Sequence, residues 1–198
     1  NEINFLREKN IKLSLQVDDL VQSGLQNEYL KKLLNFKEES TYNLRTAKVI
    51  NLGSGPIFSS LTIDLGSKDG IKKNLPIITT NGIVGKTILI NEETSLVQTI
   101  NDANFRLSVK ILPSEATGIM RFYDNDVFEI REIQKNANIK IGDKVVTSGF
   151  SKIYPEGLNA GVVTEIIDNR GSFQKVARSK NPYSENNNLY VFVVQEQN

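Results

Sequence analysis

Apolar residues recur along the first two dozen positions in alternating steps of three and four. Counted from Ile3 as an a position, this heptad seam consists of Ile3, Leu6, Asn10, Leu13, Val17 and Leu20. Such spacing is typical of a left-handed coiled coil. The polar member, Asn10, lies at an a position, where a buried Asn favours two parallel helices in register. The pattern therefore predicts a coiled-coil helix over residues 1–38 that dimerises two copies of the chain.

The seam is interrupted at Gly24, an a position without a side chain. Apolar residues then resume in a shifted phase, as they do after a stutter. An amphipathic helix folded onto its own domain is the alternative interpretation, because short heptad patterns also occur in such helices. The polar residues 37–43 that follow are typical of a linker.

After this linker the hydrophobic period changes to two, and β-branched residues gather between Gly, Asn and Asp turns. Many short strands with turns at intervals of about 8 to 12 residues indicate a β-sandwich or small barrels. The predicted strands are Arg45–Asn51, Ser60–Leu65, Pro76–Thr80, Ile83–Ile90, Leu96–Ile100, Arg106–Leu112, Thr117–Phe122, Asp126–Ile133, Lys144–Thr147, Gly161–Ile167, Phe173–Arg178 and Leu189–Gln195. The predicted fold class is therefore mainly β, with an N-terminal coiled-coil helix.

A weak internal repeat indicates that the β region contains two units of similar design. Residues 71–81 resemble residues 139–149, and each copy is followed by two glycines and a β-branched run. Chance similarity between turn-rich strands is the alternative. We predict two small β-barrel subdomains over residues 44–198. One possible division assigns the middle part, about residues 74–127, to the second barrel.

Composition limits the chemistry that this chain can perform. It contains no His and no Cys, which excludes Ser-His and Cys-His nucleophile pairs, imidazole acid-base relays, thiolate metal sites and disulfides. The 24 basic and 23 acidic residues leave a formal charge of +1, so the chain has no electrostatic footprint for nucleic acid. We expect no catalytic residue, no cofactor and no metal site.

Three short motifs resemble functional sites and are better explained as turns. Residues 85–87 (Gly-Lys-Thr) lack the upstream glycine and the following helix of a phosphate-binding loop, and residues 81–82 (Asn-Gly) are typical of a tight hairpin turn. The acidic cluster within residues 124–129 lacks the ligand spacing of a calcium loop. Ser148 has no His to activate it, and Lys152 is near it only in sequence.

Three bulky apolar residues fall within five positions of one predicted loop. They are Phe150, Ile153 and Tyr154. Because loops run over the surface, such side chains either fold back to close a barrel end or stand exposed as an anchor for a partner protein. Both outcomes are open, and we take the three as candidate partner-binding residues. If they are buried, the next candidates are Phe122, Tyr123 and Phe128.

Several motifs, in their order and spacing, resemble the MreC family of bacterial cell-shape proteins. They follow the coiled-coil segment and are residues 62–71 (TIDLGSKDGI), 81–86 (NGIVGK), 142–149 (GDKVVTSG) and 154–158 (YPEGL). The likeness covers essentially the whole chain. It departs from the family pattern at Tyr154, where the family usually has Phe.

The resemblance implies a short cytoplasmic tail, one transmembrane helix, a dimerising coiled coil and two β-barrels in the periplasm, on the extracytoplasmic face of the cytoplasmic membrane. It implies a non-enzymatic scaffold of the elongasome, the peptidoglycan synthesis machinery that maintains cell shape. The implied partners are a class B penicillin-binding transpeptidase, MreD, the MreB system and further copies of the chain.

The chain opens at Asn1, and its only methionine is Met120. We therefore expect the membrane anchor of the full-length protein to precede residue 1. The alternative function is that of a periplasmic adaptor protein of a membrane transport complex. Such an adaptor needs a helical hairpin with β-segments on both sides, whereas this sequence predicts one helix at its start.

Overall fold

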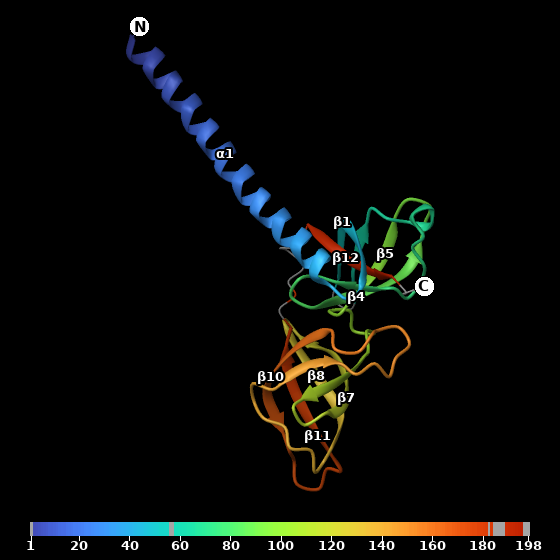
Figure 1. Cartoon of the computed structure of the whole chain (residues 1–198). Coiled ribbons are helices and arrows are strands. Elements are labelled where there is room, and N and C mark those ends of the chain that lie inside the picture. The colour runs from blue at the N-terminus through green and yellow to red at the C-terminus, as the bar shows by residue number, and fades with distance from the viewer. Residues whose placement is uncertain (1, 56–57, 182, 184–188, 196–198) are drawn as a thin grey trace. The chain divides into compact units, whose positions relative to one another are not determined.

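The computed structural model describes residues 2–55, 58–181, 183 and 189–195 (Figure 1). The chain divides into two compact units, residues 1–41 and residues 42–198. The first unit is a single helix, α1 (Glu2–Glu39), which contains no Pro and one Gly. Its many Leu, Lys, Gln and Glu residues have high helix propensity, which explains its length.

The second unit contains two closed antiparallel barrels of six strands each. Their strand orders are β1-β12-β3-β4-β5-β2 and β10-β11-β8-β7-β6-β9. The first barrel consists of β1 (Asn43–Ser54), β2 (Ser59–Ile63), β3 (Pro76–Ile78), β4 (Ile83–Ile90), β5 (Ser95–Thr99) and β12 (Tyr190–Gln195). The second consists of β6 (Leu107–Leu112), β7 (Ala116–Asp124), β8 (Val127–Gln134), β9 (Lys144–Thr147), β10 (Asn159–Ile167) and β11 (Gln174–Lys180). Closure leaves neither barrel with a free strand edge.

This architecture confirms the predicted fold class. All twelve segments predicted to be strands are strands, although most of their ends differ by one to three residues. Burial alternates strictly along β5 and β6, which is why the period-two pattern is informative. The hairpin interpretation of residues 81–82 is also confirmed, because β3 and β4 pair across that turn. Residues 85–87 lie within β4.

The prediction that the middle part, about residues 74–127, forms the second barrel is wrong. Strands β3, β4 and β5 belong to the first barrel, and the second is continuous from β6 to β11, residues 107–180. The first barrel closes when β12 returns to pair with β1 and β3. This long-range pairing decides which strands share a barrel, and no local pattern contains it. The last residues of the predicted β region, 196–198, lie outside the described residues.

Each copy of the internal repeat contains the first strand of a hairpin, which is β3–β4 in the first barrel and β9–β10 in the second. Residues 81–82 form the turn at the tip of the first hairpin, where the backbone N–H of Thr79 donates to the Gly82 carbonyl at 2.8 Å. Residues 148–158 connect the two strands of the second. The second barrel therefore carries a long loop where the first has a tight turn.

Buried apolar residues of both barrels belong to one continuous cluster. A direct contact also joins the barrels, because the Asn159 side-chain amide donates to the Asn81 carbonyl oxygen at 2.5 Å. Beside it, a Cβ added to Gly82 would lie 2.5 Å from the Asn159 carbonyl oxygen, so only glycine allows this approach.

Candidate interaction surfaces

The predicted dimerisation seam lies on α1 and is exposed. The exposed fraction of its apolar side chains runs from 51% at Leu13 to 72% at Leu20, and Asn10 is exposed as well. Within the part of the chain that the structure describes, nothing buries these six positions. A row of apolar side chains in water is unfavourable, so the seam is a surface that association with another helix would stabilise.

The three candidate partner-binding residues do not share one environment. The side chain of Phe150 is 76% exposed, Ile153 is half-buried against the core, and Tyr154 is only 4% exposed. The ring of Tyr154 packs edge-on against Phe105, with 6.3 Å between the ring centroids. Because burial removes Tyr154 from the reach of a partner, Phe150 is the member of the three that a partner can contact.

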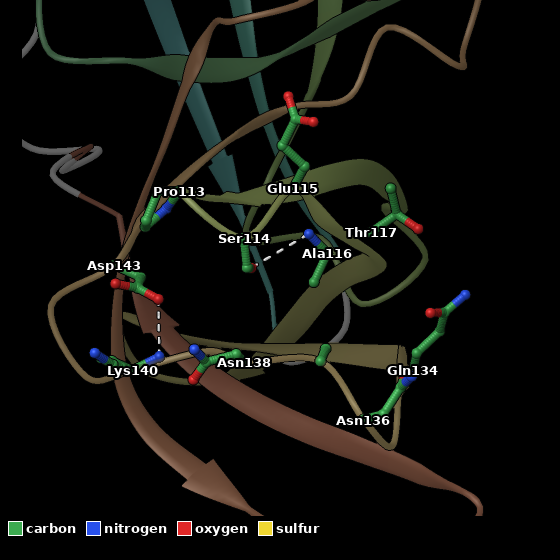
Figure 2. Close-up of a pocket in the computed structure, with 11 residues that line it drawn as sticks. Pro113, Ser114, Glu115, Ala116, Thr117, Gln134, Asn136, Asn138, Lys140 and Asp143 are labelled. Carbon is green, nitrogen blue, oxygen red and sulfur yellow. Dashed lines mark hydrogen bonds between the residues drawn. The ribbon is translucent and has the colours of Figure 1, made fainter.

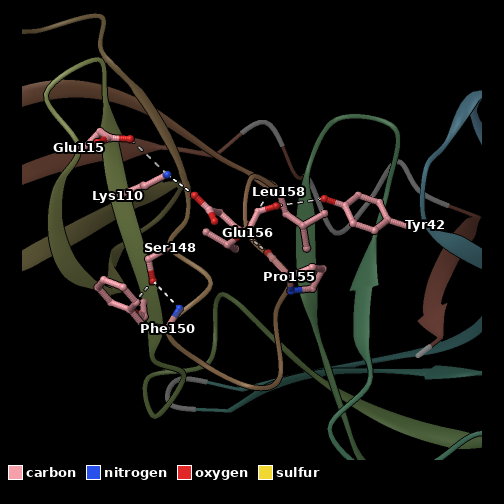
Figure 3. Close-up of polar contacts among 10 residues, drawn as sticks. Tyr42, Lys110, Glu115, Ser148, Phe150, Pro155, Glu156 and Leu158 are labelled. Atoms are coloured by element: carbon pink, nitrogen blue, oxygen red, sulfur yellow. Dashed lines mark hydrogen bonds and ion pairs between the residues drawn. The ribbon is translucent and has the colours of Figure 1, made fainter. Parts of the chain in front are cut away.

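Hydrogen bonds hold the loop that carries Phe150 (Figure 3). The Thr147 hydroxyl donates to the Pro155 carbonyl oxygen at 2.5 Å and accepts from the Leu158 backbone N–H at 2.9 Å. The Ser148 hydroxyl accepts from the Phe150 backbone N–H at 3.3 Å. These hydrogen bonds hold both ends of the loop, so the backbone that carries the exposed Phe150 ring is ordered.

An ion pair ties the same loop to the barrel wall. Lys110 Nζ contacts the carboxylate of Glu156 and lies 3.7 Å from that of Glu115. The hydrogen bond to Glu156 raises the pKa of Lys110 above its ordinary value. On the other side of the loop, the Tyr42 hydroxyl donates to the Glu156 carbonyl oxygen at 3.1 Å. Figure 3 shows Glu156 between Lys110 and Tyr42.

The second set of aromatic candidates is also divided between core and surface. Phe128 is 1% exposed, and Phe122 packs edge-on against it with 6.0 Å between centroids. Tyr123 is half exposed, and the Arg178 guanidinium lies 4.5 Å from the centroid of its ring. Arg178 also pairs with Glu165 at 2.7 Å. An exposed Tyr beside an Arg has the composition of interface hot spots.

Sequence reasoning missed two exposed apolar side chains of the second barrel, Ile141 at 69% and Phe173 at 92%. It also missed the contact between Tyr123 and Arg178, because the two residues lie 55 positions apart. The isolated position of Phe173 in a polar loop was a signal that could have found it, whereas Ile141 follows Ile139 by two positions and gives no such signal. Only the strand register could have placed Arg178 beside Tyr123.

The residues considered for chemistry have structural contacts. The Ser148 hydroxyl lies 2.8 Å from that of Ser108. Glu129 pairs with Arg131 at 2.7 Å and with Arg121 at 3.1 Å. Burial by itself raises the pKa of Glu129, but the hydrogen bonds from Arg131 and Arg121 outweigh it and hold that pKa below its ordinary value. Among the described residues, no group of three or more His, Cys, Asp or Glu side chains could hold a metal ion.

No helix in the described ranges is long and apolar enough to cross a membrane.

The family model of the rod shape-determining protein MreC, barrel core, matches residues 49–195. The chain belongs to the MreC family. The match covers strands of both barrels, and it confirms the resemblance carried by the Gly-rich and strand motifs of the sequence. It does not favour a transport adaptor.

Curated MreC relatives are similar along most of this chain. The cell shape-determining protein MreC of Listeria monocytogenes is 27% identical over 182 residues, which are 89% of this chain and 62% of that protein. The protein of the same name from Escherichia coli is 28% identical over 148 residues, 74% of this chain and 40% of that protein. The chain thus spans about 62% and 40% of the length of these two relatives.

Solved MreC structures share the fold. One described as MreC has a TM-score of 0.80 at 25% identity and covers 87% of this chain and 98% of its own. The structure from Listeria monocytogenes has a TM-score of 0.72 at 25% identity, and the match covers 98% of this chain and 96% of that one. A complex between the penicillin-binding protein PBP2 and MreC from Helicobacter pylori has a TM-score of 0.64 at 19% identity. The match covers 79% of this chain and 100% of that one.

Proposed function

We propose that this chain is a non-enzymatic scaffold of the cell-wall elongation machinery, which maintains cell shape from the extracytoplasmic face of the cytoplasmic membrane. The observation that carries the proposal is the match of the MreC family model over residues 49–195. Two closed barrels suit a scaffold, because they are rigid and have few free edges for indiscriminate pairing. A transmembrane helix outside this sequence would supply the anchor.

The proposed mechanism is geometric. Helix α1 pairs two copies through Ile3, Leu6, Asn10, Leu13, Val17 and Leu20, and each copy presents its barrels to partner proteins. Support comes from the exposure of all six seam positions and from Asn10 at an a position. In a parallel pair the two Asn10 amides can hydrogen-bond with each other, which they cannot do in a staggered or antiparallel one.

The dimer is tested by light scattering on two leucine variants of α1. Leu13 belongs to the seam and is 51% exposed, whereas Leu15 lies off the seam and is 64% exposed. We expect the parent chain and Leu15→Glu to be dimers, and Leu13→Glu to be a monomer, because a buried charge opposes pairing. Removing residues 1–38 should also leave a folded monomer.

The result that contradicts the dimer is a parent chain that stays monomeric at about 100 μM, where an association with a Kd of about 1 μM would be nearly saturated. Dissociation of both leucine variants would place the contact elsewhere on α1.

The principal partner we propose is a class B penicillin-binding transpeptidase, with MreD and the MreB system as further partners. The Helicobacter pylori structure is a complex of the penicillin-binding protein PBP2 with an MreC that has this fold. On this chain we place the contact at Phe150, because it is an exposed ring on a loop with an ordered backbone. Ile153 and Tyr154 would support the loop from beneath.

The docking site is tested by Phe150→Ala, with Phe173→Ala as the matched control on another loop of the same barrel. Both rings are exposed, so neither change should lower the melting temperature by much. We expect Phe150→Ala to weaken binding to the extracytoplasmic region of the transpeptidase by about 2 kcal/mol or more. Phe173→Ala should leave that affinity unchanged. Equal affinities for the parent and Phe150→Ala would rule out this loop, and Tyr123 would be the next candidate.

A further inference from the structure

The end of β8 and the connection from it to β9 present a row of polar side chains to solvent. From residue 134 to residue 140 the exposure alternates, so that every second residue faces outward. The outward residues are Gln134, Asn136, Asn138 and Lys140. The residues between them turn inward, since Ala137 packs against the core and Ile139 is 8% exposed. Three amides and one ammonium group therefore share one side of this segment.

Contacts from neighbouring elements hold this row in place. Lys175 Nζ donates to the Ala137 carbonyl oxygen at 2.8 Å, and Lys135 pairs with the carboxylate of Asp168. The backbone N–H of Lys140 donates to Asp143 Oδ2 at 2.8 Å. A ligand that binds along the row would therefore order little additional backbone, which favours affinity.

The row forms one wall of a cavity of about 660 Å³ (Figure 2). The opposite wall is the turn from Pro113 to Thr117. That turn is itself braced, because the Ser114 hydroxyl donates to the Ile111 carbonyl oxygen at 3.1 Å. The volume lies within the range of about 300 to 1,000 Å³ that is usual for small-ligand sites.

The polar groups of the cavity are available to a ligand. Within the described part of the chain, the side chains of Thr117, Gln134, Asn136 and Asn138 make no hydrogen bond to protein. Each amide offers two N–H donors and one carbonyl acceptor. Together they can bind a molecule that carries both kinds of group at close spacing.

The charges of the cavity favour a neutral ligand over an anionic one. Lys140 is opposed by Glu115 and Asp143, which also line the cavity. A phosphate or a polyanion would therefore meet more repulsion than attraction. Ala116 and Ala137 add two small apolar surfaces that suit a methyl group. Hydroxyls, amides and methyl groups on one uncharged molecule are the chemistry of an N-acetylated glycan.

We propose that this cavity is a binding site for a short stretch of neutral N-acetylated glycan. Asn136 and Asn138 hydrogen-bond its acetamido and hydroxyl groups, and Thr117 contacts it from the opposite wall. The site goes beyond the scaffold function and does not depend on it, because it lies on different loops from Phe150 and on a different element from the α1 seam.

The test is an NMR titration of the whole chain with chitotetraose, and with cellotetraose as the matched ligand without acetamido groups. We expect saturable shifts of the side-chain amide signals of Asn136 and Asn138 with chitotetraose. Cellotetraose should bind several-fold more weakly. The double variant Asn136→Ala, Asn138→Ala should lower the affinity by roughly tenfold or more. Asn104→Ala, which removes an exposed amide outside the cavity, should leave it unchanged.

The proposal is overturned if chitotetraose produces no saturable shift at about 5 mM, where a ligand with a Kd of about 1 mM would be largely bound. Equal affinity of the parent chain and the double variant would overturn it as well. A short peptide that shifts the same amide signals where the glycan does not would assign the row to peptide recognition and contradict the glycan. Because both variants change only exposed residues, their unchanged melting temperature is the control for folding.

Discussion

At the scale of single residues, the most informative position is Tyr154. Its ring is buried against Phe105, yet its hydroxyl has no hydrogen-bond partner among the described residues. Burial also raises the pKa of this hydroxyl, since the ionised form would lose its hydration. The ring contributes to packing, whereas the hydroxyl loses its hydrogen bonds to water and gains none from the described residues.

Replacing Tyr154 by Phe should therefore stabilise the protein. Removing a buried hydroxyl without a partner is expected to contribute about 1 kcal/mol, which for a chain of this size raises the melting temperature by about 2–4 °C. Tyr154→Ala should instead cost about 3–5 kcal/mol, because it also leaves a cavity. Calorimetry on both variants checks this. A lower melting temperature for Tyr154→Phe would show that a bound water satisfies the hydroxyl.

Glu129 makes stability depend on pH. Because Arg131 and Arg121 hold its pKa below the ordinary value in the folded chain, the folded state binds its proton less readily than the unfolded state does. The stabilisation is therefore present above the ordinary value of about 4.3 and is lost as the pH falls through the lowered folded value. The free energies of unfolding of the parent chain and of Glu129→Gln, measured by denaturation, should differ most at neutral pH and become equal in acid. If the difference between these free energies instead grew below about pH 4, the predicted direction of the pH dependence would be wrong.

At the scale of elements, α1 combines an exposed apolar seam with one polar position, Asn10. Replacing Asn10 by Val should raise the thermal stability of the paired helix, because an apolar a position packs better. The same change should weaken the preference for two strands. Circular dichroism and light scattering check both effects. Asn4→Val, off the seam on the same helix, should change neither, and an unaltered melting curve for Asn10→Val would indicate that Asn10 does not lie in a contact.

The strands were predictable from the sequence because burial alternates along them, as it does in β5 and β6. The tight turn at residues 81–82 was predictable because its Asn-Gly pair has a specific backbone preference. The separation of Phe150 from Tyr154 was not, since two bulky apolar residues four positions apart on a loop carry no local signal of which one is buried. The polar row at 134–140 was missed for a related reason: exposed amides in a loop look like ordinary solvated surface.

At the scale of the whole molecule, the pairing of β12 with β1 and β3 makes the first barrel dependent on the end of the chain. The second barrel, from β6 to β11, needs no strand from outside residues 107–180. Membership of β12 in the first barrel could not be predicted, because its pairing partners lie more than a hundred positions away and its apolar run fits either barrel.

A chain that ends at residue 189 should therefore lose the first barrel and retain the second. Without β12, strands β1 and β3 become free edges, and the buried residues Val191, Phe192 and Val193 are gone. NMR spectra should keep dispersed signals for the second barrel only. A chain that ends at residue 195 is the control and should keep both. Loss of all dispersed signals in the shorter chain would show that the two barrels unfold as one cooperative unit.

The antiparallel pair of β1 and β12 also decides how the protein carries tension. Asn43 lies opposite Gln195, and Lys48 lies opposite Tyr190, so the chain from α1 enters at one end of this ladder and the chain from the second barrel enters at the other. A pull between Asn43 and Tyr190 would run along the strands, at right angles to the hydrogen bonds of the ladder. All six residue pairs would then share the load in shear. A pull on Asn43 and Gln195 would instead separate the pairs one by one, so this ladder resists force between the two ends at which the chain enters it better than force between Asn43 and Gln195.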